Sequence, residues 1–294
     1  MAYAYLYNMV AMDNLTKTVT IDWEWVRTHL SARERLEKIA EGSTKEAVLT
    51  HLKEALDIAE SKAAPAIALV KKEIINFKPY SFEVEGGITL SGRELSSYMK
   101  LPGLKAGVSI CPEPPPSLKL WRDPAPGSTD GGKIPPRLSA VSRPRFWGGG
   151  IKGATHIYAF LVTIGKGVEE AATSLMNSGD HLLGYLLDRA GSFAVESMAK
   201  NMEDTLRRSL APENLSVSMR FSPGYCDWPI EEQFKLAGII DFAKAGVVLT
   251  ENCVMIPKKS ISAVVGIGPK VLFAKVKSPC AVCNMKVCDY RRID

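Results

Sequence analysis

The sequence predicts an α+β fold in which a largely antiparallel sheet is flanked by helices. Segment 82–90 alternates apolar and polar residues around a glycine pair, as a β-hairpin does. The run 157–164 has the continuous apolar composition of a buried strand. Segment 180–208 has the apolar spacing of one long helix. Because strands and helices mix without strict βαβ repetition, an antiparallel sheet is favoured.

Composition and charge exclude several classes of protein. The chain has 294 residues, 46% hydrophobic and 23% charged, which is typical of a globular protein with a sizeable core. Its net charge of +5 is dispersed, so no nucleic-acid partner is expected. We expect no membrane span, no signal peptide in residues 1–10, and a start at Met1 or Met12. The uneven cysteines are unlike a secreted disulfide framework, so we expect a cytoplasmic protein.

In the N-terminal region, residues 1–100, the sequence pattern predicts helices and a hairpin. Segment 19–25 alternates enough to predict a short strand, which leads into a helix. A stronger helix begins near Ser43, which has capping-box spacing to a glutamate. Pro65 kinks or ends that helix, and the apolar residues of 67–70 predict a second helical piece.

Residues 101–150 differ in kind from what flanks them. Proline and glycine clusters, including Pro114-Pro115-Pro116, break any periodicity and predict an inserted loop or disordered linker. A regular core follows over residues 151–277, and a cysteine-rich tail occupies residues 278–294.

The core predicts a helix over 168–176 and a longer one capped by Asp180. Gly184 and Gly191 lie two turns apart on the longer helix, so they share a face that permits close approach of a neighbour. Further elements are then predicted in order. They are a strand over 216–221, a turn at 222–224, a helix from about 230, and strands over 247–256 and 260–267.

The most specific segment is 220–229, Arg-Phe-Ser-Pro-Gly-Tyr-Cys-Asp-Trp-Pro. It resembles the signature loop of the activation domain of cobalamin-dependent methionine synthase, Arg-x-x-x-Gly-Tyr-x-x-x-Pro. Leu249-Thr250-Glu251, Pro257 and Ser260-Ile261-Ser262 follow at the expected distance and in the expected order. The resemblance covers about 154–277, is greatest to short stand-alone members, and implies an activation-domain-like fold.

The resemblance implies a binding site for S-adenosylmethionine around this loop. A guanidinium at a strand end, Arg220, can fork onto the ligand's carboxylate. The turn at Ser222 and Gly224 exposes backbone groups for the adenine edge. Tyr225 offers a ring face to the sulfonium, or a hydroxyl. Arg220 as a surface strand residue and Tyr225 as packing for the turn remain alternatives.

Two acidic residues complete the site that the resemblance implies. Glu196, on the preceding long helix, matches a family glutamate and is expected to pair with the ligand's positive end. Asp22, in Ile21-Asp22-Trp23, is similar to a family aspartate near the start. The alternative for Glu196 is a solvated helix position.

Cys280, Cys283 and Cys288 form a C-x-x-C-x-x-x-x-C cluster in the tail. Three close thiols suit zinc or an iron–sulfur cluster, with Cys226 or Cys253 as a candidate fourth ligand. Stand-alone family members often end in a similar tail. A mobile tail with free thiols is the alternative.

The resemblance implies an accessory protein that restores a cobalamin enzyme of methionine biosynthesis. It would bind S-adenosylmethionine and support reductive remethylation of cob(II)alamin held in trans by a methionine synthase or related corrinoid protein. An electron donor such as flavodoxin is expected, and no catalytic residue is assigned to the chain. Two alternatives stay open: a corrinoid-protein activator that does not use S-adenosylmethionine, and a metal or iron–sulfur redox module.

Overall fold

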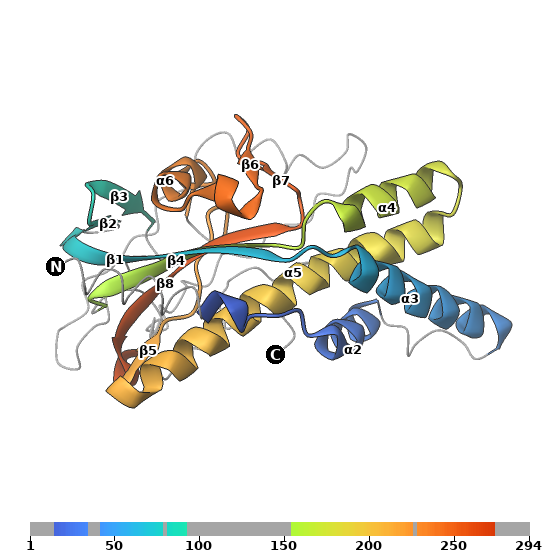
Figure 1. Cartoon of the computed structure of the whole chain (residues 1–294), viewed down its shortest axis with the longest axis horizontal. Helices are drawn as coiled ribbons and strands as arrows, with labels where there is room; N and C mark the ends of the chain where they lie inside the picture. The colour runs from blue at the N-terminus through green and yellow to red at the C-terminus, as the bar shows by residue number, and fades with distance from the viewer. Residues whose placement is uncertain (1–14, 35–41, 79–80, 93–153, 226–227, 274–294) are drawn as a thin grey trace, which may run out of the picture. The chain divides into compact units, whose positions relative to one another are not determined.

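A computed structural model describes residues 15–34, 42–78, 81–92, 154–225 and 228–273 (Figure 1). All of the described residues belong to one compact unit. The 101–150 insertion and the cysteine tail lie outside the described residues.

One antiparallel sheet organises the described residues. Its strands are β1 (Ala66–Lys78), β2 (Ser81–Val84), β3 (Ile88–Ser91), β4 (His156–Thr163), β5 (Leu215–Val217) and β8 (Ser260–Pro269). The order across the sheet is β3-β2-β1-β4-β8-β5, and every pair is antiparallel. The predicted α+β class, the 82–90 hairpin and the strands over 157–164 and 260–267 are therefore confirmed.

Helices pack on both faces of this sheet. The elements besides the sheet strands are α2 (Trp23–Arg33), α3 (Ser43–Lys62), α4 (Gly167–Asn177), α5 (His181–Leu210), η3 (Ala211–Glu213), α6 (Glu232–Ile239), η4 (Phe242–Ala245), β6 (Val248–Leu249), β7 (Met255–Ile256) and α7 (Lys270–Phe273). In Figure 1, α5 with α2 and α3 lies on one side of the sheet, and α6 with the β6–β7 hairpin lies on the other.

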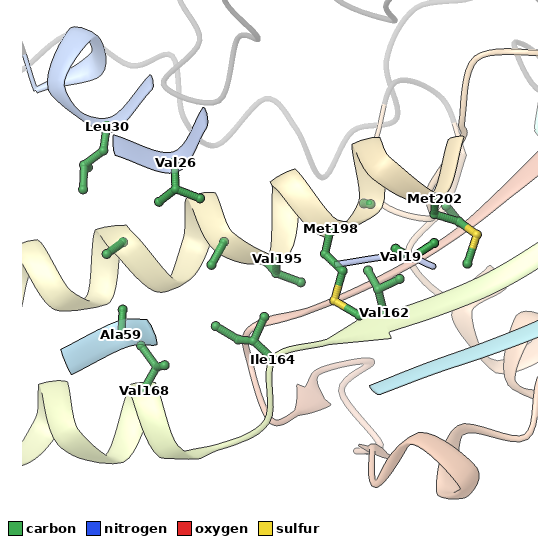
Figure 2. Packing of buried hydrophobic residues seen from close by; sticks show 14 of the residues in the cluster. Val19, Val26, Leu30, Ala59, Val162, Ile164, Val168, Val195, Met198 and Met202 are labelled. Atoms are coloured by element: carbon green, nitrogen blue, oxygen red, sulfur yellow. The ribbon is translucent and has the colours of Figure 1, made fainter. Parts of the chain in front are cut away.

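Alternation along the central strands divides the core between the two faces. Phe160 and Val162 of β4 belong to the cluster with α5, whereas Ala159 and Leu161 belong to the cluster with α6. Figure 2 shows the α5 side, where side chains of β4 lie against side chains of α5. Because apolar side chains are buried on both faces, the sheet is a rigid support for the side chains and loops at its edges.

The strand predicted over 19–25 is wrong, since helix α2 begins at Trp23. Asp22 ends the extended segment by capping the helix, and its carboxylate accepts a hydrogen bond from the Trp25 amide at 2.9 Å. The Asp22 amide donates to the Ser197 hydroxyl at 2.8 Å, and the Asn201 side chain donates to the Thr20 carbonyl at 2.8 Å. This segment therefore bonds to side chains of α5 and not to a neighbouring strand.

The second helical piece predicted over 67–70 is also wrong, because these residues lie in strand β1. Helix α3 ends at Lys62, before Pro65, as predicted, but its N-cap is Gly42 and not Ser43. Strand β1 pairs with β4 on one side and β2 on the other. Pairing with strands distant in sequence overrides a short apolar pattern that fits either state.

The strand predicted over 247–256 is a hairpin of two short strands, β6 and β7. The Thr250 amide donates to the Val254 carbonyl at 2.9 Å, and Cys253 takes a left-handed φ of +59° in the turn. The strand predicted over 216–221 is shorter than expected. Strand β5 ends at Val217, beyond which the Ser218 hydroxyl accepts a hydrogen bond from the Gly266 amide at 2.9 Å, and the ladder is interrupted.

The predicted close approach at two glycines of α5 is confirmed. A Cβ at Gly184 would lie 2.7 Å from Met176 Cγ and 3.0 Å from the Ala172 carbonyl oxygen. A Cβ at Gly191 would lie 2.8 Å from Val168 Cγ1. Both glycines thus face α4, and Asp180 caps α5 as predicted, accepting from the Leu183 amide at 3.3 Å.

We expect Gly184→Ala to lower the free energy of unfolding by about 1–2 kcal/mol, although alanine favours helices, because the backbone of α4 must shift. The matched control is Gly238→Ala in α6, where the new Cβ meets only Ile88 Cδ1 at 3.5 Å. That control should be neutral or stabilising by up to about 1 kcal/mol. Urea unfolding of both variants measures the difference, and equal stabilities would contradict the packing described.

Across the described ranges, every helix is too short or too polar to span a bilayer.

Candidate functional site

Arg220 lies between the end of β5 and the 222–228 bend, with its side chain only 2% exposed. The next residue fixes this position. The Phe221 amide donates to the Val264 carbonyl at 2.9 Å, and the Val264 amide donates back to the Phe221 carbonyl at 2.8 Å. The Arg220 side chain reaches α5, so the guanidinium sits between the sheet and the longest helix.

Two carboxylates of α5 pair with this guanidinium. Arg220 NH2 forms an ion pair with Glu196 Oε1, and Nε lies 3.3 Å from Glu203 Oε1. Glu196 and Glu203 are seven residues apart, which puts both on one face of the helix. The structure therefore brings together Arg220 and Glu196, which the sequence placed in one site from separate elements.

Glu203 is a member of this site that sequence analysis missed. Its side chain is 6% exposed, and its second oxygen lies 2.9 Å from NH2 of Arg207. NH1 of Arg207 in turn lies 3.0 Å from an oxygen of Asp204. The signal was present in the sequence, because a glutamate two turns beyond Glu196 must face the same way.

One nitrogen of the Arg220 guanidinium, NH1, is left without a hydrogen-bond partner among the described residues, although it is buried. A buried donor without an acceptor costs about 1–3 kcal/mol, so such groups in native proteins are usually paired with protein, water or ligand. The free NH1 lies beside NH2 on the guanidinium, and these two nitrogens present parallel N–H groups that match a carboxylate. This geometry suits an anionic ligand.

The bend after Arg220 is tight, as predicted. The Tyr225 amide donates to the Ser222 carbonyl at 3.2 Å, and the Gly224 amide donates to the Trp228 carbonyl at 2.8 Å. Gly224 takes a φ of +88°, and a Cβ there would lie 2.9 Å from Ile230 Cδ1. The positive φ therefore favours glycine here, and the terminal methyl of Ile230 would have to move to admit a larger residue.

In the described part of the bend, side chains are more available to a ligand than backbone amides are. The amides of Gly224 and Tyr225 are bonded inside the bend, whereas the Tyr225 side chain is exposed, at 61%. Trp228 is buried on the α6 side, and within the described ranges its ring N–H has no partner. Cys226 and Asp227 lie outside those ranges.

Asp22 lies beside α5 through its backbone, which donates to Ser197, the residue after Glu196. Its carboxylate caps α2. Ser260 and Ser262 of the sequence motif serve the sheet: the Ser260 hydroxyl donates to Thr163 Oγ1 at 2.8 Å, and the Gln233 side-chain amide donates to Ser262 Oγ at 2.6 Å. These contacts hold β8, which in turn supports Arg220.

The predicted metal ligands Cys280, Cys283 and Cys288 lie outside the described residues, as does Cys226. Cys253 is a half-buried free thiol in the β6–β7 turn. In the part of the chain that the structure describes, no group of three or more His, Cys, Asp or Glu residues is placed to hold a metal ion. The metal site of the tail stays a prediction.

Comparison with protein families addresses the resemblance directly. Residues 150–292 match the family model described as the activation domain of vitamin B12 dependent methionine synthase. This match confirms the resemblance to the activation domain. The matched segment contains the Arg220 loop, the long helix α5 and strand β8. No curated protein matches the chain significantly.

A solved structure extends the likeness to the fold. "Crystal Structure of the MetH Reactivation Domain bound to AdoHcy" matches with a TM-score of 0.51 and 18% sequence identity. The match covers 85% of this chain and 71% of that one, so it reaches beyond the activation-domain segment into the N-terminal elements. The activation-domain-like α+β fold predicted from the sequence is thereby confirmed.

Proposed function

We propose that this chain binds S-adenosylmethionine and supports the reductive remethylation of cob(II)alamin on a partner methionine synthase. The observation that carries the proposal is the buried Arg220, whose NH1 has no partner in the described residues. It stands in the Arg-x-x-x-Gly-Tyr spacing of the activation domain, inside the segment that matches the family. A fold shared with a structure that holds AdoHcy adds support.

Each charge of the ligand has a complementary group here. Arg220 binds the carboxylate through NH1 and NH2. Glu196, with a side chain that is 29% exposed, faces the ammonium. The exposed Tyr225 ring contacts the cationic sulfonium, whose methyl group is what the bound ligand supplies. Ser222 and Gly224 form the part of the site that faces the adenine. Asp22, at the start of α2, lies at the edge of the same site.

The role of the protein in this reaction is positioning. Methyl transfer to reduced cobalt moves no proton, so no general acid or base is required of the chain. Residues on a rigid sheet and a long helix hold the donor in one orientation, which turns a chance encounter into a reactive geometry. Arg220 and Glu196 fix one end of the donor, so that the other end is presented to the partner's cofactor.

The partner is a cobalamin-dependent methionine synthase that lacks its own activation domain, or a related corrinoid protein. Flavodoxin or a comparable donor supplies the electron. We propose a cytoplasmic location, in keeping with these partners. Cys280, Cys283 and Cys288 form a zinc or iron–sulfur site in the tail, and purified full-length chain without iron or zinc by elemental analysis would refute that part.

Calorimetric titration of the full chain with S-adenosylmethionine tests binding, and methylcobalamin formation on an added methionine synthase tests reactivation. We expect saturable heat, together with remethylation that depends on both the chain and a reductant. Absence of binding heat would favour a corrinoid-protein activator that does not use S-adenosylmethionine. Absence of both heat and remethylation would reject the proposed function.

A further inference from the structure

We propose that Glu196 is an internal substitute for the ligand's carboxylate, so that binding exchanges ion pairs at Arg220 and selects a zwitterion. This inference rests on the proposed function and adds a specificity mechanism to it. Its starting point is that Arg220, the group expected to bind the ligand, is already paired with two carboxylates of α5.

The three nitrogens of the Arg220 guanidinium differ in whether a carboxylate faces them. Arginine has one N–H on Nε and two on each terminal nitrogen. Here Nε faces Glu203 and NH2 faces Glu196, while NH1 has no partner in the described residues. A carboxylate that binds NH1 and NH2 together must share NH2 with Glu196, and the repulsion between the two carboxylates favours displacement of Glu196, whereas Glu203 at Nε need not be disturbed.

The two glutamates differ in how firmly they are held. Glu203 is buried, with one oxygen toward Arg220 and the other 2.9 Å from Arg207. Glu196 is 29% exposed and lies nearer the helix start by two turns. Withdrawing Glu203 would leave charges unpaired in the interior, which is costly, whereas Glu196 can turn toward solvent. Glu203 thus positions Arg220 permanently, and Glu196 is the exchangeable partner.

Replacing Glu196 by the ligand at Arg220 leaves every charge paired only if the ligand carries both a carboxylate and an ammonium. Before binding, Glu196 neutralises Arg220. After binding, the ligand's carboxylate neutralises Arg220, and the ligand's ammonium neutralises Glu196. A ligand with the carboxylate but without the ammonium would place two like charges side by side, and such a pairing is unfavourable. Glu196 therefore admits amino-acid ends and rejects simple acids.

The test compares two adenosyl thioethers by calorimetry on the full chain. S-adenosylhomocysteine carries both charges, and S-adenosyl-thiobutyrate keeps the carboxylate but lacks the ammonium. We expect the wild-type chain to prefer the zwitterion by about tenfold or more. In Glu196→Gln the zwitterion should bind more weakly and the simple acid more tightly, so that the preference falls about tenfold. The control Glu170→Gln makes the same change at an exposed position of α4 and should keep the wild-type preference.

The outcomes separate the inference from the function on which it rests. If the wild-type chain binds neither thioether and does not bind S-adenosylmethionine either, the proposed function fails and the inference with it; binding of S-adenosylmethionine without binding of S-adenosylhomocysteine overturns the inference alone. If the wild-type chain binds both equally, the inference is overturned while the binding function stands, and this result needs no variant. If folded Glu196→Gln keeps the wild-type preference for the zwitterion, the inference is likewise overturned while the binding function stands.

Discussion

Replacing Arg220 with alanine is expected to weaken binding of S-adenosylmethionine by about 1.5–3 kcal/mol, the range for a hydrogen bond to a charged group. That corresponds to about a tenfold to hundredfold rise in Kd. The reason is geometric: no other described cation shares the position of Arg220 between the bend and the two glutamates of α5. Calorimetric titration measures the loss directly.

Arg220→Lys separates charge from shape. Lysine keeps the positive charge but lacks the planar fork, so its affinity should fall between wild type and alanine. Because Arg220 is buried, circular dichroism must first show that each variant is folded. Wild-type affinity in folded Arg220→Ala would contradict the assignment of the site.

Glu203→Ala should lower the free energy of unfolding by about 3 kcal/mol, because removing one member of a buried ion pair leaves its partner uncompensated. Arg220 would lose the carboxylate at Nε and would keep the ion pair with the partly exposed Glu196. Urea unfolding, monitored by tryptophan fluorescence, measures the change. Loss of the positioning group should also weaken ligand binding in the fraction that folds.

Asp204→Ala is the matched control for that prediction. Asp204 pairs with the same Arg207, but its side chain is 41% exposed, so its removal should cost less than about 1 kcal/mol. The double variant Arg220→Met/Glu203→Met removes both charges and should be more stable than Glu203→Ala alone. Equal effects of Glu203→Ala and Asp204→Ala would show that burial does not distinguish the two carboxylates.

The elements that sequence alone predicted well are those with local determinants. The hairpin over 82–90 depends on alternation and on a glycine pair with φ of +96° and +76°. The start of α5 depends on Asp180, three residues from the amide that it caps. The strand over 157–164 is almost continuously apolar, as expected where both faces of the sheet are covered. In each case neighbouring residues decide the outcome.

The elements that were predicted wrongly depend on distant partners. Residues 67–70 are apolar at intervals that fit a helix, but Ile67 pairs with Val162, almost a hundred residues later. The backbones of Thr20 and Asp22 are bound by side chains of α5, again across a long separation. Neither contact leaves a mark in the local pattern, and tertiary pairing decides such segments.

In the candidate site, too, some features follow from the local sequence and others depend on distant contacts. Arg220, Ser222, Gly224 and Tyr225 follow from one motif, and the structure shows the predicted bend around them. The ion pairs of Arg220 with Glu196 and Glu203 depend on how α5 crosses the sheet. Sequence pattern cannot show that a ligand's expected anchor is already paired inside the protein.

A crystal structure of the full chain with S-adenosylhomocysteine would show directly whether Arg220 anchors the ligand. We expect the ligand's carboxylate within hydrogen-bond distance of Arg220 NH1 and NH2, Glu196 turned to the ammonium, and Glu203 still at Nε. A ligand bound elsewhere, with Arg220 still paired to both glutamates, would contradict this expectation.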